Sequence, residues 1–303
     1  MSAPRVSLLV PCRNAAGYLP RLFEGVQSQT RPFDEILCYD DRSTDDTVAV
    51  ARSFGARVLP ADGPSTGPAK ARNRLAAAAT GEWIHFHDAD DLISPAYLST
   101  LLPLGTADSE LVFCDADWIG EERRELWVAW RYDAAPLAAD PVSYLIRQPV
   151  GINNGLFRRA PFLAAGGFDE SLLRWEDNDV YVRLAAAGGR VRHVPGVYTW
   201  SLRHTDSFSH DYRKNWRCRV QALEKYAATL PGSARAVIAE EAEKAAQNLV
   251  ALADLEGARP ALALCRRLGH PVPTTRHPAL RLIRLFLPAL WLLRFQHHRR
   301  ARA

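Results

Sequence analysis

The sequence has no paired cysteine motif, a single methionine and no long uninterrupted apolar run. Its five cysteines are scattered, form no CxxC pair and have no histidine at zinc-finger spacing, which excludes a disulfide-rich scaffold and a zinc finger. The apolar run at residues 6–10 ends at Pro11 and is too short for the core of a signal peptide. The sequence therefore predicts a cytoplasmic protein with reduced thiols.

The overall composition is that of an average globular protein. The chain has 303 residues, of which 48% are apolar and 24% charged. These fractions exclude a disordered, collagen-like or coiled-coil chain. The length predicts one large domain with an appendage, or two modest domains.

Charge is distributed unevenly along the chain. Residues 257–303 contain ten arginines and neither a lysine nor an acidic residue, whereas residues 1–256 carry 34 acidic and 28 basic side chains. A basic tail of this kind can meet nucleic acid, anionic lipid or an acidic partner.

Short β-rich runs alternate with helical patterns in the first half of the chain, which predicts an α/β fold with a mostly parallel sheet. Strands are expected at 6–10, 36–39, 57–59, 83–87, 110–116, 152–157, 191–194 and 197–202. Helices are expected after the first two strands, over residues 69–79 and from Trp175. After residue 211 the pattern is helical to the end, so we expect one domain at 1–211 and a helical region at 212–303.

Asp88-Ala89-Asp90-Asp91 directly follows the strand at 83–87. At the end of a strand, residues i and i+2 point to one side, so Asp88 and Asp90 could converge on one ion or one metal–diphosphate unit. Carboxylates are the ligands that Mg²⁺ and Mn²⁺ prefer. The alternative is an acidic turn that caps the helix expected after Ser94-Pro95.

Two other polar segments are candidates for ligand contacts. In DDRSTDDT at 40–47, helix capping accounts for residues 43–46 but leaves Asp40 and Asp41 to accept hydrogen bonds from a base or ribose. The segment at 67–73 opens a helix, where Lys70 and Arg72 would strengthen a diphosphate site unless they form a solvated basic face. Ligands of open α/β sheets bind at the carboxyl ends of the strands, where these segments are expected.

The order and spacing of these motifs resemble the family 2 glycosyltransferases of the GT-A fold. The resemblance covers about residues 5–210 and is carried by VSLLVPCRN at 6–14, SQT at 28–30, DDRSTDDT at 40–47, ARN at 71–73, GEW at 81–83 and DADD at 88–91. It implies a Rossmann-like, mostly parallel sheet flanked by helices, followed here by a C-terminal helical appendage. Residues 1–118 are then expected to bind the nucleotide sugar and residues 119–211 the acceptor.

The resemblance also implies the donor contacts, which are expected at Pro11, Asp41, Gly67, Arg72, Asp88, Ala89 and Asp90. Pro11 and Asp41 would hold the nucleoside, with Asp41 accepting a hydrogen bond from uracil. Arg42 departs from the family, which usually has glycine there, and could reshape this pocket.

For catalysis, the resemblance implies that Asp177 is the base and that Asp90 and His204 reach a bound Mn²⁺ or Mg²⁺. An inverting transfer needs a base for the acceptor hydroxyl and a cation for the departing diphosphate. Glu176 and Asp179 are expected to raise the pKa of Asp177 through like-charge repulsion.

The expected activity is a metal-dependent, inverting transfer from a nucleotide sugar, UDP-linked, to a hydroxyl of a glycan or lipid-linked acceptor in surface polysaccharide or glycolipid assembly. Acceptor contacts are expected from residues 127–132 and from Asn153-Asn154, because sugars stack on aromatic rings and bond to amides. The alternative is a non-catalytic member that binds a glycan or a partner.

The C-terminal tail is very apolar yet contains several arginines and is divided by Pro288. It is too short and too charged to cross a bilayer. Residues 276–303 are expected either to lie on an anionic membrane surface at its cytosolic face, or to pack on the catalytic domain or a dimer interface. Nucleic-acid binding is not expected, because arginine alternates with leucine and phenylalanine.

Overall fold

The computed structural model describes residues 3–63, 67–105, 109–122, 124–203 and 211–270. Contacts within the chain divide it into two compact units, Met1–Ser207 and Phe208–Ala303. His204 and the tail at 276–303, for which the sequence predicts metal and membrane contacts, lie outside the described residues.

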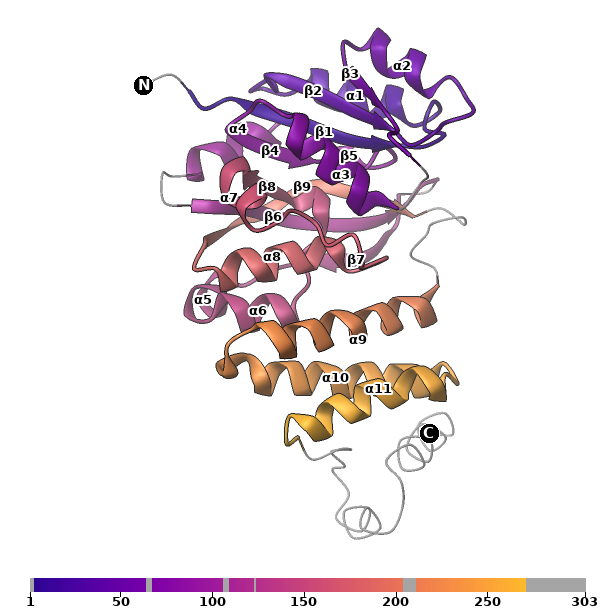
Figure 1. Ribbon diagram of the computed structural model, residues 1–303. Helices are drawn as coiled ribbons and strands as arrows, with labels where there is room; N and C mark the ends of the chain where they lie inside the picture. Colours follow the sequence, from indigo (N-terminus) through magenta and orange to yellow (C-terminus); the bar gives the residue numbers. More distant parts are fainter. Residues whose placement is uncertain (1–2, 64–66, 106–108, 123, 204–210, 271–303) are drawn as a thin grey trace. The chain divides into compact units, whose positions relative to one another are not determined.

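The first unit contains all the strands of the described chain and eight of its α-helices (Figure 1). The strands are β1 (Val6–Cys12), β2 (Glu35–Asp40), β3 (Arg57–Pro60), β4 (Trp83–Phe86), β5 (Leu92–Ile93), β6 (Ser109–Gly120), β7 (Leu126–Trp130), β8 (Gly155–Arg158) and β9 (Arg190–Arg203). The helices are α1 (Leu19–Gln27), α2 (Thr47–Ser53), α3 (Pro68–Ala78), α4 (Tyr97–Leu101), α5 (Ala134–Ala139), α6 (Pro141–Arg147), α7 (Arg159–Ala164) and α8 (Glu176–Ala186). This confirms the predicted α/β class.

The described strands form one mixed sheet in the order β3-β2-β1-β4-β8-β6-β9-β5, with β7 paired to β6 outside this path. Strands β3, β2, β1 and β4 are parallel neighbours, as are β6 and β9. Strand β8 runs antiparallel to both β4 and β6. The carboxyl ends of β1, β2 and β4 therefore meet at one edge, which positions the loops that follow them.

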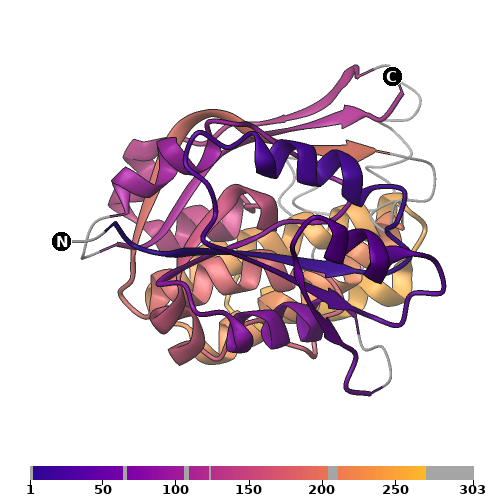
Figure 2. The same cartoon turned by 90° about the horizontal axis from the view of Figure 1, so that it is seen from above.

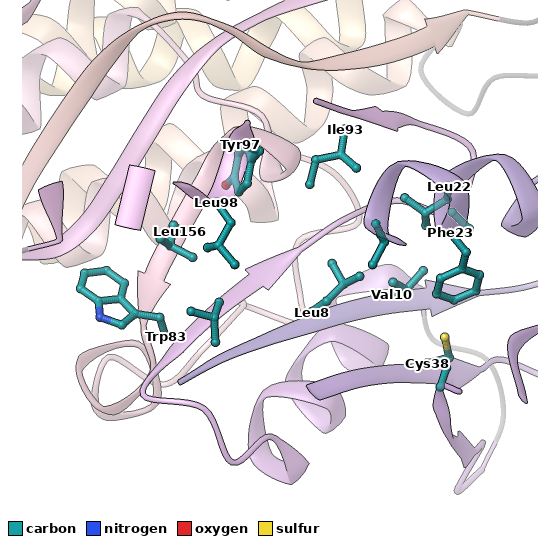
Figure 3. Packing of buried hydrophobic residues seen from close by; sticks show 14 of the residues in the cluster. Leu8, Val10, Leu22, Phe23, Cys38, Trp83, Ile93, Tyr97, Leu98 and Leu156 are labelled. Atoms are coloured by element: carbon teal, nitrogen blue, oxygen red, sulfur yellow. The ribbon is translucent and has the colours of Figure 1, made fainter. Parts of the chain in front are cut away.

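Helices cover both faces of this sheet (Figure 2). On one face, α1 and α4 pack on alternate residues of the strands, and Figure 3 shows Leu22 and Phe23 of α1 beside Val10 of β1. The buried positions of α1 recur at the i, i+3, i+4, i+7 spacing of an amphipathic helix. On the other face, Phe86 of β4 contacts Phe162 of α7 and Phe168.

Several elements differ from the sequence-based expectation. The strands expected at 191–194 and 197–202 are one strand, β9, because residues 195 and 196 bulge out of its pairing with β6. Gly196 permits this with φ 118°. The beginning of the strand expected at 152–157 is a 3₁₀ turn, Ile152–Asn154. Strand β7 lies where no strand was expected from the sequence.

The second unit consists, in its described part, of α9 (Tyr212–Thr229), a 3₁₀ turn (Gly232–Ala234), α10 (Arg235–Ala251) and α11 (Leu255–Arg267). Small and branched apolar side chains form its core: Val220, Ala245, Ala246, Leu249, Val250, Ala258, Ala261 and Leu262. Asp254 accepts hydrogen bonds from Gly257 N–H at the start of α11 and from Arg217. None of the described helices is both long and apolar enough to span a membrane.

All five cysteines fall within the described ranges, and each of them is a buried free thiol. Three belong to the first unit, Cys12, Cys38 and Cys114, and two to the second, Cys218 and Cys265. This agrees with the reduced state predicted from their spacing. A side-chain hydrogen bond with Cys38 and burial raise the pKa of the Cys12 thiol, and burial raises that of Cys114 to about 12.

Candidate functional site

The loops after β1 and β2 are joined by hydrogen bonds at the carboxyl edge of the sheet. Asn14 N–H donates to Ser43 Oγ at 2.9 Å, and Ala16 N–H donates to Asp45 Oδ2 at 3.1 Å. Helix α2 begins only at Thr47, behind an N-cap residue whose side chain makes no capping bond. Asp45 Oδ1 also accepts a hydrogen bond from Thr47 N–H at 3.1 Å, so part of the predicted capping is present beside the contacts that join the two loops.

The residues predicted to hold a nucleoside lie at this edge. The last paired residues of β1 and β4 are Leu9 and Phe86, and Pro11 lies beyond them. Proline has no N–H, but at this position its absence removes no hydrogen bond between β1 and β4. Asp41 follows β2 directly, and its N–H donates to Cys12 O at 2.8 Å. Pro11 and Asp41 thus lie on neighbouring strand ends.

Arg42 occupies the left-handed region of backbone conformation, with φ 63°. This conformation costs a residue with a side chain about 1–2 kcal/mol, and glycine adopts it freely. Arg42 therefore departs from the family's glycine at a turn that favours glycine. The turn itself is retained, and with it the position of Asp41 at the end of β2.

Gly67 precedes α3 with φ 99°, a conformation that side chains rarely permit. The following Pro68 occupies the first turn of the helix, where the missing N–H needs no partner. Lys70 pairs with Asp62 at 3.3 Å. The helix thus begins sharply behind a glycine.

Asp91, the last residue of the DADD segment, is buried and holds the segment in place. Its Oδ1 accepts a hydrogen bond from Leu202 N–H at 2.8 Å, and its Oδ2 accepts from Ser201 Oγ at 3.0 Å and from Asn153 Nδ2. Burial raises the pKa of its carboxyl well above the ordinary value, and the charges of Asp90 and Asp88 raise it further. Helix α4 begins behind Ala96 with no side-chain cap, so the acidic-turn alternative for this segment is wrong.

Asp88 is joined to the start of α8 by one buried arginine. Arg72, on α3, is 5% exposed and donates from Nη2 to Asp88 Oδ1 at 2.6 Å. Its Nη1 donates to Glu176 Oε1 at 2.8 Å. The second contact could not be predicted from the sequence, because 104 residues separate the two partners and neither local spacing nor periodicity indicates such a pair.

Asp177, the predicted base, lies in the first turn of α8 behind Trp175, whose φ of 71° turns the chain into the helix. Burial raises the pKa of Asp177, the charge of Asp88 raises it further, and the Arg72 guanidinium opposes both. Burial and the charge of Asp177 raise the pKa of Glu176 to about 7. Asp179 instead pairs with Arg183 at 2.7 Å, so Asp88 replaces it as a source of repulsion.

A divalent ion fits the chemistry of this edge of the sheet. Among the described residues, no three histidine, cysteine or acidic side chains form a ready-made metal site. Mg²⁺ and related ions are commonly held by one or two carboxylates, with substrate phosphates and water as the other ligands. Asp90 is partly exposed in the loop after β4, beside Asp88. The donor set therefore fits an ion whose coordination is completed by a bound diphosphate.

Strand β7 presents an exposed apolar surface. Leu126, Trp127 and Val128 are 57%, 50% and 39% exposed, and the indole N–H of Trp127 donates to Glu125 at 2.8 Å. Leu126 of β7 is paired with Ile119 of β6, and Ile119 is paired with Leu202 of β9. Leu202 N–H in turn donates a hydrogen bond to Asp91.

The predicted acceptor contact of Asn153 and Asn154 is not supported by their environment. Both are buried, and Asn153 accepts a hydrogen bond from Asp88 N–H at 2.9 Å. Asn154 donates to Cys114 O at 2.9 Å. Their amides instead join the 3₁₀ turn to the loop after β4 and to β6.

The family model described as Glycosyl transferase family 2 matches residues 7–167 of the chain. The chain is similar to the uncharacterized glycosyltransferase YibD of Escherichia coli (strain K12), with 32% identity over 132 residues, 42% of this chain and 38% of YibD. It is also similar to the succinoglycan biosynthesis protein ExoU of Rhizobium meliloti (strain 1021), with 28% identity over 207 residues, 62% of this chain and 59% of ExoU. The chain thus spans less than two thirds of either relative.

Solved structures share the fold at low sequence identity. The structure of Staphylococcus aureus TarS 1-349 in complex with UDP-GlcNAc has a TM-score of 0.59 and 16% identity, over 88% of this chain and 92% of that one. The mannosyltransferase PcManGT from Pyrobaculum calidifontis, in complex with GDP-Man and Mn²⁺, has a TM-score of 0.60 and 20% identity, over 98% of this chain and 85% of that one. These likenesses confirm the predicted GT-A fold.

Proposed function

The chain belongs to glycosyltransferase family 2, and from this premise we propose that it transfers a sugar from a nucleotide sugar to a hydroxyl of a glycan or lipid-linked acceptor. One observation carries the proposal. Arg72 brings the loop with Asp88 and Asp90 next to the helix start with Asp177, although the two come from distant parts of the chain. This link supports a donor site at the loop and a base at the helix start that act on the same substrates.

We propose a UDP-sugar as donor, with the nucleoside over Pro11 and Asp41, the diphosphate toward Gly67, Asp88 and Ala89, and a divalent ion at Asp90. The structures of TarS in complex with UDP and of PcManGT with GDP-Man and Mn²⁺ support a nucleotide sugar and a metal. Polysaccharide assembly is supported by the name of ExoU.

The proposed reaction is a single displacement with inversion. Asp177 accepts the proton of the acceptor hydroxyl as that oxygen bonds to the anomeric carbon, and the bond from this carbon to the diphosphate breaks on the opposite side. The divalent ion would stabilise the negative charge of the leaving diphosphate. No covalent enzyme intermediate forms, so the chain needs no nucleophile.

Nucleotide release from a panel of UDP-, GDP- and dTDP-sugars, with and without Mn²⁺, tests this proposal. We expect slow, metal-requiring release from one donor, and none from the Asp177→Asn variant under the same conditions. A chain that neither releases nor binds any nucleotide would contradict the proposal and favour the non-catalytic alternative.

We propose that the exposed face of β7 carries the acceptor, with a sugar ring stacked on Trp127. The hydrogen bond to Glu125 fixes the indole. Aromatic stacking contributes about 0.5–1.5 kcal/mol beyond buried area, so Trp127→Ala is expected to raise the acceptor KM about tenfold with the donor KM unchanged. Leu104→Ala, at a side chain 40% exposed elsewhere in the unit, is the matched control. An unchanged acceptor KM in Trp127→Ala would remove this surface from the proposal.

A further inference from the structure

We infer that the ion-pair chain Asp88–Arg72–Glu176 couples the loop after β4 to the start of α8, and that Arg72 and Glu176 are positioning residues for the transfer. This inference rests on the proposed function and deepens it. The sequence predicts Arg72 as a direct donor ligand, whereas the structure surrounds its guanidinium with protein groups.

The guanidinium of Arg72 has little access to solvent or to a ligand. Both of its terminal nitrogens bond to carboxylates, at 2.6 and 2.8 Å, and the side chain is 6% exposed. Its Nε is also inaccessible to solvent. The Phe168 ring lies 5.7 Å from the guanidinium carbon. A group enclosed in this way is placed to act through Asp88 and Glu176.

The planar, forked guanidinium is suited to this geometry. It can donate to two carboxylates from fixed, diverging nitrogens, whereas the lysine ammonium is a compact charge on a flexible stem. The burial of both the arginine and Glu176 also strengthens the interaction, because little water screens it. Removing either Arg72 or Glu176 leaves the other as an incompletely paired buried charge.

The coupling has a direct consequence for the base. Glu176 and Asp177 are consecutive in the first turn of α8, so a fixed Glu176 side chain also fixes the backbone that carries Asp177. At the other end of the ion-pair chain, Asp88 fixes the loop after β4, which also carries Asp90. The distance and orientation between the base and the donor loop therefore depend on Arg72, and small displacements of reacting groups lower rates strongly.

A double-mutant cycle on the full chain tests the inference, with Arg72→Lys, Glu176→Gln and both together, and with UDP binding measured beside turnover. We expect each single variant to lower kcat about tenfold or more, with the Kd for UDP in the presence of Mn²⁺ changed less than threefold. The kcat of the double variant should fall no further than that of either single variant, because both substitutions break the same set of ion pairs. Arg74→Lys is the matched control, because Arg74 lies on the same helix, is exposed and pairs with Asp62.

Thermal unfolding of each variant separates a lost contact from a lost fold. Glu176→Gln keeps the shape of the side chain and carries the test if Arg72→Lys does not fold. The inference is overturned if Arg72→Lys weakens UDP binding in proportion to its loss of turnover, or if the two effects add. If the wild type is active and the variants give either of these two results, the inference fails and the proposed function stands. A wild type with no turnover on any donor would overturn both the inference and the proposed function.

Discussion

Asp177→Asn is expected to lower sugar transfer by about 10³-fold while leaving UDP binding and the fold unchanged. The amide has nearly the same shape as the carboxylate but cannot accept the proton of the acceptor hydroxyl, and general base catalysis contributes about 10²–10⁴-fold. Burial raises the pKa of Asp177 and so makes it a stronger base than an ordinary carboxylate, while Arg72 favours its charged form. Turnover with saturating donor and a UDP titration of the same preparation measure the two quantities.

The matched control for Asp177→Asn is Asp133→Asn. Asp133 is the N-cap of α5, where its side chain accepts a hydrogen bond from Ala135 N–H. Asparagine caps helices about as well as aspartate, so this variant should keep full activity. If Asp177→Asn retained more than about a tenth of wild-type turnover, Asp177 would not be the base.

Asp90→Asn is expected to abolish most of the stimulation by Mn²⁺, with a loss of about 10²-fold at a metal concentration that saturates the wild type. The reason is the replacement of a charged oxygen ligand by a neutral amide at a site that the diphosphate completes. Turnover measured against Mn²⁺ concentration should show a raised half-saturation point for the variant.

The neighbouring Asp91→Asn separates the metal role from a structural one. Asp91 is buried and accepts hydrogen bonds from Ser201 and Leu202, so this variant should unfold at a lower temperature but keep the wild-type dependence on Mn²⁺. An Asp90→Asn variant with an unchanged Mn²⁺ profile would show that the ion is not held at Asp90.

The elements with strong local patterns could be predicted from the sequence. The apolar strands β1, β2 and β4 and the amphipathic helix α1 follow from burial on the faces of one sheet. Parallel strands then bring Asp41 and Asp88 to one edge, which follows from topology without any knowledge of contacts. The donor side of the candidate site was thus accessible to sequence reasoning.

The remaining features depend on tertiary contacts that local patterns do not encode. Strand β7 is exposed along most of its length, so it lacks the apolar alternation of a half-buried strand. Ser43 and Asp45 have the residue types of a helix cap, but both also bond to the loop after β1, which local pattern does not predict. The pairing of Arg72 with Glu176 joins two helices through the interior and has no local periodicity.

Burial of the five thiols makes their oxidation depend on the stability of the fold. An oxidant reacts with an exposed thiolate, and burial both removes access and disfavours the thiolate form of Cys114 and Cys265. In the folded protein, oxidation must wait until a unit opens, so its rate is governed by the opening free energy of that unit. The packed core therefore protects the sulfur atoms from oxidation for as long as each unit stays folded.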